Sequence, residues 1–231
     1  MLSSRHAQDD STAVHWLALF TALIPIVSVH ITYLISASQG FVPWCMPYID
    51  SCASISATGR HGVAFYLFKG TMIPSATSLM LFWFFSARWL RLIGDRSHFP
   101  SVILWVGIIG AIFLIVYAVA LGAAGETLRL QRRIGITIYF AFTFFSQLLM
   151  TYRLGLVVTL PARIYLQTIS YTILAIGLCT VALGLLLDNY EQDYENAFEW
   201  VAALLIHLYF LIVWFVWKKN KLGFHLTASD A

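Results

Sequence analysis

The amino-acid sequence predicts an all-α fold, a polytopic transmembrane bundle of six helices with both termini in the cytoplasm. The first observation is composition: of 231 residues, 60% are hydrophobic and 11% charged, and the mean hydropathy is +0.79. Soluble domains contain about 45–50% apolar and about 25% charged residues. The second is a series of long apolar segments, and the third is where lysine and arginine lie between them. This composition excludes a soluble globular protein, a disordered chain and a nucleic-acid binder.

Each apolar segment has about the 20 residues that a helix needs to cross a hydrocarbon core roughly 30 Å thick. In chain order the segments cover residues of about 15–36, 63–86, 101–122, 134–153, 165–187 and 198–217. The connections between them are too short to fold a separate domain with its own core. We therefore predict a single integral membrane domain over residues 1–231, with any function inside the bundle or on its loops.

The residues within these segments suit membrane helices. Pro25 and Pro74 interrupt the first two segments, and proline is tolerated where neighbouring groups bind the freed backbone carbonyl. Cys179, in the segment 165–187, is expected to be a buried thiol. The tryptophans near the segment ends predict a belt at the membrane interface. They are Trp44, Trp83, Trp89, Trp200, Trp214 and Trp217.

Lysine and arginine predict the orientation, because cytoplasmic loops carry an excess of both. With six spans, one side holds nine of these residues: Arg5, Arg88, Arg91, Arg96, Arg153, Arg163, Lys218, Lys219 and Lys221. The other side holds four: Arg60, Arg129, Arg132 and Arg133. Lys69 falls inside a segment and is not counted. The side with nine, which includes both termini, is predicted to be cytoplasmic.

The first outer loop, about 38–62, has the most unusual composition. Its prolines and glycines favour turns, and its hydroxyl groups can bond to the local backbone. Four hydroxyl-bearing residues stand close to Arg60 and His61, which predicts a surface that binds an anion or a sugar. They are Ser51, Ser54, Ser56 and Thr58. The alternative is a turn-rich plug without a ligand. Cys45 and Cys52 in this loop are predicted to form a disulfide, since an outward face is oxidising.

Lys69 follows the loop and lies inside the second apolar segment. One interpretation is a lysine that extends its ammonium group to the membrane surface. The other is a functional charge, since an ionised group at this depth needs a partner or water. Candidate partners are Glu199, Asp188 and a lipid phosphate. The second interpretation predicts an outward-facing site between the segments 63–86 and 198–217.

The loop and the helix before it resemble a known family. The shared pattern is a proline within the first helix, a closing Tyr-x-Ile-Ser, a Gly-x-Val-x-Pro loop, Pro-Tyr-Ile and Ser-Ile-Ser-x-Thr-Gly. It is carried by Pro25, Tyr33, Ile35, Ser36, Gly40, Val42, Pro43, Pro47, Tyr48, Ile49, Ser54, Ile55, Ser56, Thr58 and Gly59. This looks like the Frag/DRAM/Sfk family of FGF-receptor-activating and damage-regulated autophagy modulator proteins, most strongly over about 20–80.

The resemblance implies a six-helix membrane protein concerned with lipids. Members act in remodelling the lipid of glycosylphosphatidylinositol anchors, in plasma-membrane lipid organisation and in lysosomal autophagy control. Family versions of the loop often read Ser-Asp-Thr-Gly, and here Ala57 replaces the acid. Asp50-Ser51-Cys52-Ala53 also separates two elements of the pattern. A role that requires the missing carboxylate does not transfer to this chain.

Other chemistries have weaker signals in the sequence. The histidines are scattered without metal-ligand spacing, so no metal site is predicted. Haem ligation would use His15, His30 or His207. Ester hydrolysis would use Ser54 or Ser56 with His61 and an acid, but no Gly-x-Ser-x-Gly turn is present. A transporter would need inverted repeats and several charges at mid-membrane.

These observations favour a protein that binds, or helps to handle, a lipid or lipid-linked glycan at its outer face. The predicted ligand-binding residues are Ser54, Ser56, Thr58, Arg60, His61, Lys69 and Glu199. Membrane lipids are the expected partners, together with a possible membrane-protein partner, and no cofactor or nucleic acid is expected. The alternative is a membrane enzyme that remodels lipid acyl or headgroup esters, followed by a small transporter or a haem protein.

Overall fold

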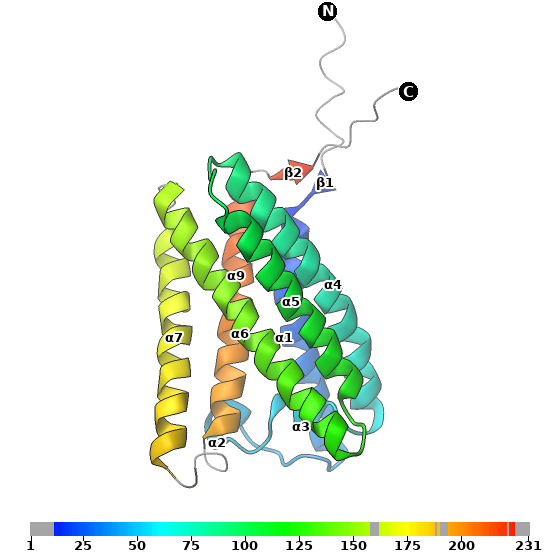
Figure 1. The fold of residues 1–231 in the computed structure, drawn as a ribbon. Helices are drawn as coiled ribbons and strands as arrows, with labels where there is room; N and C mark the ends of the chain where they lie inside the picture. Colours follow the sequence, from blue (N-terminus) through cyan, green and yellow to red (C-terminus); the bar gives the residue numbers. More distant parts are fainter. Residues whose placement is uncertain (1–11, 158–161, 188, 190–193, 221, 225–231) are drawn as a thin grey trace, which may run out of the picture.

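The computed structural model describes residues 12–157, 162–187, 189, 194–220 and 222–224, and it shows a bundle of long helices (Figure 1). In chain order the long helices are α1 (His15–Ser38), α4 (Gly62–Leu92), α5 (Phe99–Ala120), α6 (Glu126–Val157), α7 (Arg163–Leu186) and α9 (Glu195–Lys219). Two short helices, α2 (Pro47–Asp50) and α3 (Ile55–Thr58), lie in the loop between α1 and α4. The predicted helical membrane fold is confirmed.

Five of these helices are long and apolar enough to cross a membrane: α1, α5, α6, α7 and α9. Helix α4 has 31 residues and runs the length of the bundle. It carries Lys69, Arg88 and Arg91, and it is not among the helices whose hydropathy and charge are typical of a membrane span. The count of six crossings therefore stays a prediction.

The helices extend beyond the predicted segments, most clearly in α6. This helix begins at Glu126, whereas the apolar segment begins near 134. Its first turns carry Glu126, Arg129, Arg132 and Arg133. Helix α4 likewise continues to Leu92, beyond the predicted 86. Hydropathy detects the part of a helix that faces lipid, so polar extensions of the same helix are missed.

The two ends of the bundle differ in what they carry. Strand β1 (Thr12–Ala13), before α1, pairs antiparallel with β2 (Gly223–Phe224), after α9. This pairing places the start of α1 and the end of α9 at one end, called here the terminal end (Figure 1). Helices α2 and α3 lie at the opposite end, called here the loop end. The arrangement agrees with an even number of crossings, while the side that each end faces stays a prediction.

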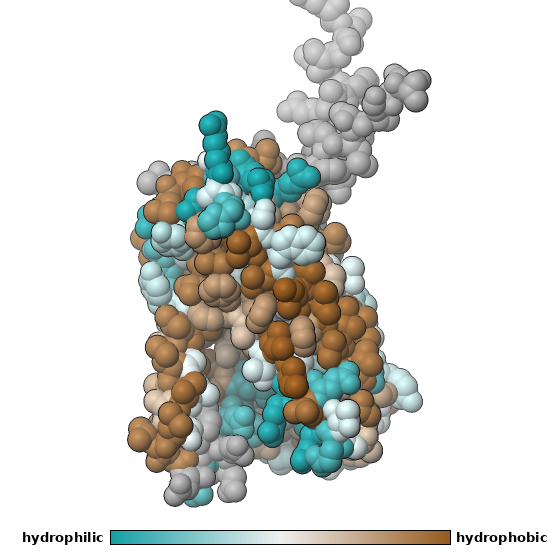
Figure 2. All heavy atoms as spheres, viewed as in Figure 1, coloured by the Kyte–Doolittle hydropathy of each residue, from teal (hydrophilic) through white to brown (hydrophobic). Residues whose placement is uncertain are grey.

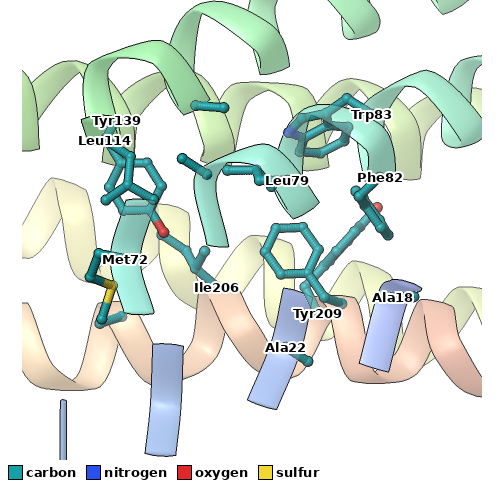
Figure 3. Packing of buried hydrophobic residues seen from close by; sticks show 14 of the residues in the cluster. Ala18, Ala22, Met72, Leu79, Phe82, Trp83, Leu114, Tyr139, Ile206 and Tyr209 are labelled. Atoms are coloured by element: carbon teal, nitrogen blue, oxygen red, sulfur yellow. The ribbon is translucent and has the colours of Figure 1, made fainter. Parts of the chain in front are cut away.

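Small residues allow the first helix to sit deep in the bundle. Helix α1 packs against both α4 and α9, α5 packs between α4 and α6, and α7 packs on α6 and α9. Ala18 and Ala22 of α1 are completely buried, so the backbone of α1 approaches its neighbours closely. Figure 3 shows these alanines among larger core residues from α4 and α9.

The core near the terminal end is built from aromatic rings of α4 and α9. The Phe82 ring lies 4.8 Å from that of Phe210 and 5.2 Å from that of Trp217, and Trp89 also contacts Trp217. The predicted tryptophan belt is therefore wrong for four of its members: Trp83, Trp89, Trp200 and Trp217 are buried.

Helix α7 is packed along only half of its length. Its buried residues are Leu166, Ser170 and Ile173, all in the half nearer the terminal end. Cys179, in the other half, is exposed, so the prediction of a buried thiol is wrong. Figure 2 shows a broadly hydrophobic side surface, as expected for helices that face lipid tails.

Candidate functional site

The loop between α1 and α4 is folded back onto the bundle. Cys45 and Cys52, the pair predicted from the sequence, form a disulfide with their Cα atoms 6.6 Å apart. The Tyr33 hydroxyl of α1 donates to the Cys45 carbonyl at 2.7 Å and accepts from the Cys45 amide at 2.8 Å. The disulfide and this tyrosine together hold the first half of the loop against the end of α1.

Helix α9 holds the second half of the loop. Trp200 Nε1 donates to the carbonyl of Ala53 at 2.9 Å. Asn196 Nδ2 donates to the carbonyl of Ser51 at 2.7 Å. Ser51 is buried and has a φ of 52°, a left-handed conformation that its contacts to α9 stabilise. The loop is therefore an ordered part of the bundle, as its apolar composition predicts.

Three loop residues form one polar chain at the start of α4. Ser54 caps α3 by accepting from the Ala57 amide at 3.1 Å, and its oxygen lies 3.1 Å from that of Ser56. Arg60 Nη2 donates to the Ser56 oxygen at 2.7 Å. The Glu199 carboxylate of α9 reaches the same helix and accepts from the Ile55 amide at 3.2 Å.

Two polar atoms beside this chain are buried and have no hydrogen-bond partner among the described residues. One is Nε of Arg60, and the other is the hydroxyl of Tyr117 on α5, whose side chain is only 1% exposed. Arg60, Arg132 and Glu199 lie close enough for their charges to act on this hydroxyl. Buried polar groups are nearly always bonded, so these two atoms have hydrogen-bonding capacity that the described residues do not use.

The charges of this site are not matched. Arg60 and Arg132 lie within electrostatic range of each other, and the carboxylate of Glu199 lies within range of Arg60. In the described part of the chain, none of the three takes part in an ion pair. We call Ser54, Ser56, Arg60, Tyr117, Arg132 and Glu199 the loop-end cluster. Within this cluster, two guanidinium groups stand against one carboxylate, a set that suits an anion, and Glu195 lies within electrostatic range of Glu199 at its edge.

The other predicted binding residues lie elsewhere. Thr58 is buried, and its hydroxyl lies 3.2 Å from that of Thr32 on α1. His61 is exposed, and its ring lies 5.1 Å from that of Phe41. The structure therefore brings Ser54, Ser56, Arg60 and Glu199 together and leaves Thr58 and His61 outside.

Lys69 faces α5 rather than α9. Its Nζ donates to the Val119 carbonyl in the last turn of α5 at 3.0 Å and lies 4.2 Å from the centre of the Phe65 ring. A lysine at a helix C-terminus bonds one of the carbonyls that the helix leaves free. The proposed pairing with Glu199 is absent among the described residues, and Asp188 lies outside them.

His30 and His207 line one small cavity between α1 and α9. Nδ1 of His30 donates to the Ile26 carbonyl, and the Tyr48 hydroxyl lies 3.0 Å from its Nε2. Burial raises the pKa of Tyr48, so this phenol stays protonated and donates. His207 likewise donates to a backbone carbonyl, and its Nε2 lies 3.5 Å from the Tyr139 hydroxyl. The cavity volume of about 20 Å³ is that of one water, so the geometry disfavours haem here.

The residues required for ester hydrolysis are not assembled either. In the described part of the chain, no hydrogen bond joins His61 to Ser54 or Ser56, and no group of three or more histidine, cysteine or acidic side chains could hold a metal ion. Most of the acidic loop before α9 lies outside the described residues.

Sequence reasoning missed Tyr117 and Arg132. Tyr117 lies near the end of an apolar segment and carries no local signal of function. Arg132 was counted only for orientation. Their link to the loop depends on the crossing of α5 and α6, where Gly135 allows the backbone of α6 to approach that of Tyr117. A carbon atom added at Gly135 would lie 2.9 Å from the Tyr117 nitrogen, so only glycine permits this crossing.

Comparison with known proteins gives one match. A family model described as the Frag1/DRAM/Sfk1/Cwh43P N-terminal domain matches residues 13–219. No curated protein and no solved structure matches the chain. The matched range runs from the start of α1 to the end of α9 and includes the whole loop-end cluster.

Proposed function

The chain belongs to the Frag1/DRAM/Sfk1/Cwh43P N-terminal domain family, and on that premise we propose that this multi-pass membrane protein binds the phosphate-bearing headgroup of a lipid or lipid-linked glycan at its loop end. The observation that carries the proposal is the unmatched charge of the loop-end cluster. Among the described residues, neither the buried Nε of Arg60 nor the buried hydroxyl of Tyr117 has a hydrogen-bond partner. Guanidinium groups bind phosphate through paired, charge-assisted hydrogen bonds.

The single carboxylate of the cluster adds selectivity to this proposal. Glu199 accepts one hydrogen bond from the Ile55 amide, and a carboxylate has capacity for several more. A hydroxyl or ammonium group next to the phosphate would supply the donor. Ser54 and Ser56 add hydroxyls that both donate and accept. The cluster therefore fits a headgroup that carries a phosphate and a neighbouring polar donor, such as a sugar or an amine.

The location of the cluster agrees with an outward-facing site. We keep the orientation in which the nine lysines and arginines of the terminal side face the cytoplasm and the four of the other side face outward. The disulfide between Cys45 and Cys52 supports the same orientation, because such bonds persist on oxidising faces of membranes.

A binding measurement on arginine variants tests the proposal. The purified protein in phosphatidylcholine nanodiscs is titrated with phosphatidic acid, and Arg60→Gln is compared with Arg133→Gln. Arg133 is exposed on the same side of the protein and serves as the matched control. Loss of one charge-assisted hydrogen-bond donor should weaken binding by about tenfold or more. Equal affinity of the Arg60→Gln protein and the wild type would refute the proposal.

A further inference from the structure

Helices α6 and α7 are joined near the terminal end and separate toward the loop end. The hydroxyls of Thr151 on α6 and Ser170 on α7 lie 3.2 Å apart. Beyond Ile173, the described residues of α7 are exposed or half-buried. Figure 1 shows α6 running diagonally away from α7 as both approach the loop end.

Helices α6 and α9 also part in this region. Their hydrogen bonds begin at Thr151, whose hydroxyl lies 3.0 Å from that of Tyr209, and include Gln147, which donates to the Ile206 carbonyl at 2.8 Å. The last one toward the loop end is that of Tyr139, whose hydroxyl lies 3.5 Å from His207 Nε2. In the described residues nearer the loop end, no hydrogen bond joins the two helices. Arg132 on α6 and Glu199 on α9 lie in this part, beyond the last bonded pair.

The opening between α6 and α7 is polar inside and apolar at its edge. Figure 2 shows hydrophilic side chains exposed in the hollow between these helices near the loop end, with the hydrophobic surface of α7 beside them. Leu178 of α7 is 63% exposed and Leu185 is 82% exposed. Polar groups that face lipid tails are costly unless they are bonded. An amphipathic molecule with its head inside and its chains outside matches both surfaces.

We propose that a phosphate-bearing lipid reaches the loop-end cluster sideways from the bilayer, through the opening between α6 and α7. Its phosphate lies between Arg60 and Arg132, and the Tyr117 hydroxyl donates to it. Its acyl chains remain in the bilayer against the exposed half of α7. This inference rests on the proposed function and adds the route, the position of the chains and the requirement that the ligand be a lipid.

The lateral route has a physical advantage over approach from water. A lipid that moves sideways keeps its chains in hydrocarbon throughout, so no apolar surface is transferred to water. On the water side, Ser51, Ala53 and Ile55 are each bonded to α9, so the loop is held against the bundle beside the cluster. The two like charges of Arg60 and Arg132 attract the phosphate from its position at the membrane surface.

A pair of tryptophan substitutions on α7 tests the route. Thr180 lies two turns beyond Ile173 on the same face of α7 and is half-buried, so Thr180→Trp places a large ring in the opening. Ile164→Trp places the same ring on the exposed surface of α7 near the terminal end, away from the opening, as a matched control. Both proteins, in phosphatidylcholine nanodiscs, are labelled with phosphatidic acid that carries a diazirine in one acyl chain. The labelled peptides are then identified by mass spectrometry.

In the wild type we expect the label on the exposed half of α7. The total label should be unchanged in Ile164→Trp, and in Thr180→Trp it should fall to the level of Arg60→Gln. Excess glycerol 3-phosphate, which lacks chains, should leave the label unchanged. Wild-type label in Thr180→Trp, or displacement by glycerol 3-phosphate, would overturn the lateral route while leaving headgroup binding intact. Wild-type label in Arg60→Gln would instead overturn the proposed function, and the lateral route with it.

Discussion

Replacing Asp95 with asparagine would test the buried ion pair that joins the turn between α4 and α5 to α6. The Asp95 side chain is completely shielded from solvent, and the Arg153 side chain is 15% exposed. Nε and Nη2 of Arg153 each donate to one oxygen of the carboxylate at 2.8 Å. The amide and hydroxyl of Ser97 also donate to it, at 3.0 and 2.6 Å. The carboxylate is thus fully bonded, and Arg153 depends on it.

The burial of this ion pair sets how much stability the substitution should remove. Removal of one partner of a buried ion pair leaves the other charge uncompensated, which costs about 3–5 kcal/mol. Asparagine retains one acceptor oxygen, so we expect Asp95→Asn to lower the free energy of unfolding by about 3 kcal/mol, at the lower end of that range. The pair of Arg129 and Glu126 is the matched control. Its side chains are 65% and 82% exposed, and Glu126→Gln should cost about 1 kcal/mol or less.

The effect of Asp95→Asn should depend on pH. Hydrogen bonding to Arg153 holds the pKa of Asp95 well below its usual range, against the opposing effect of burial, and Ser97 lowers it further. A carboxyl group with a lowered pKa stabilises the fold above its unfolded pKa, about 3.9, and this stabilisation is lost as the pH falls toward the folded pKa. The difference in the free energy of unfolding between the wild type and Asp95→Asn should therefore be constant above about pH 5 and become smaller below about pH 4.

The assay is unfolding by sodium dodecyl sulfate in mixed micelles, followed by far-ultraviolet circular dichroism at pH 7, 4, 3 and 2. The wild type, Asp95→Asn and Glu126→Gln are compared at each pH. The reasoning is refuted if Asp95→Asn costs no more than the exposed control at pH 7. It is also refuted if the cost stays constant down to pH 2.

Two further predictions concern residues near the loop end. A carbon atom added at Gly59 would lie 2.6 Å from the Phe68 ring, so Gly59→Ala should lower the free energy of unfolding by about 1–3 kcal/mol. At Gly70 nothing lies within 4 Å of the added carbon, so Gly70→Ala should be neutral or stabilising. Equal melting temperatures of these two variants would contradict this packing. Lys69→Met should remove the bond to the Val119 carbonyl, at a cost of about 1 kcal/mol, and leave binding of phosphatidic acid unchanged. A loss of binding comparable to that of Arg60→Gln would show that Lys69 does belong to the binding site.

Local patterns predicted much of this molecule. The apolar segments located the long helices, because a membrane span needs a continuous apolar run. The cysteines of the first loop were predicted as a pair on the basis of their exposure to an oxidising face. Ser54, Ser56 and Arg60 are close in the sequence, and the short helix α3 keeps them close in space. Their proximity therefore needed no knowledge of the tertiary structure.

The remaining features depend on which helices are neighbours, and hydropathy does not reveal this. Lys69 was assigned to a site shared with the last helix, but α4 packs on α1 and α5, so Lys69 caps α5. Tyr117 and Arg132 join the cluster only because α5 and α6 cross closely. The angles between helices also decide that only half of α7 packs against its neighbours. Hydropathy does not reveal these angles, so Cys179 was predicted to be buried although it is exposed.

The attachment of the first loop to α9 constrains how the protein is made. Ser51, Ala53 and Ile55 obtain their α9 partners 144 to 147 residues later in the chain. During synthesis, the loop and its serines are therefore complete long before the helix that holds them has left the ribosome. Until then, Cys45 and Cys52 can hold the first half of the loop in shape, because the seven-residue separation needs no later segment. The loop-end cluster is thus completed last, because Glu199 comes from α9.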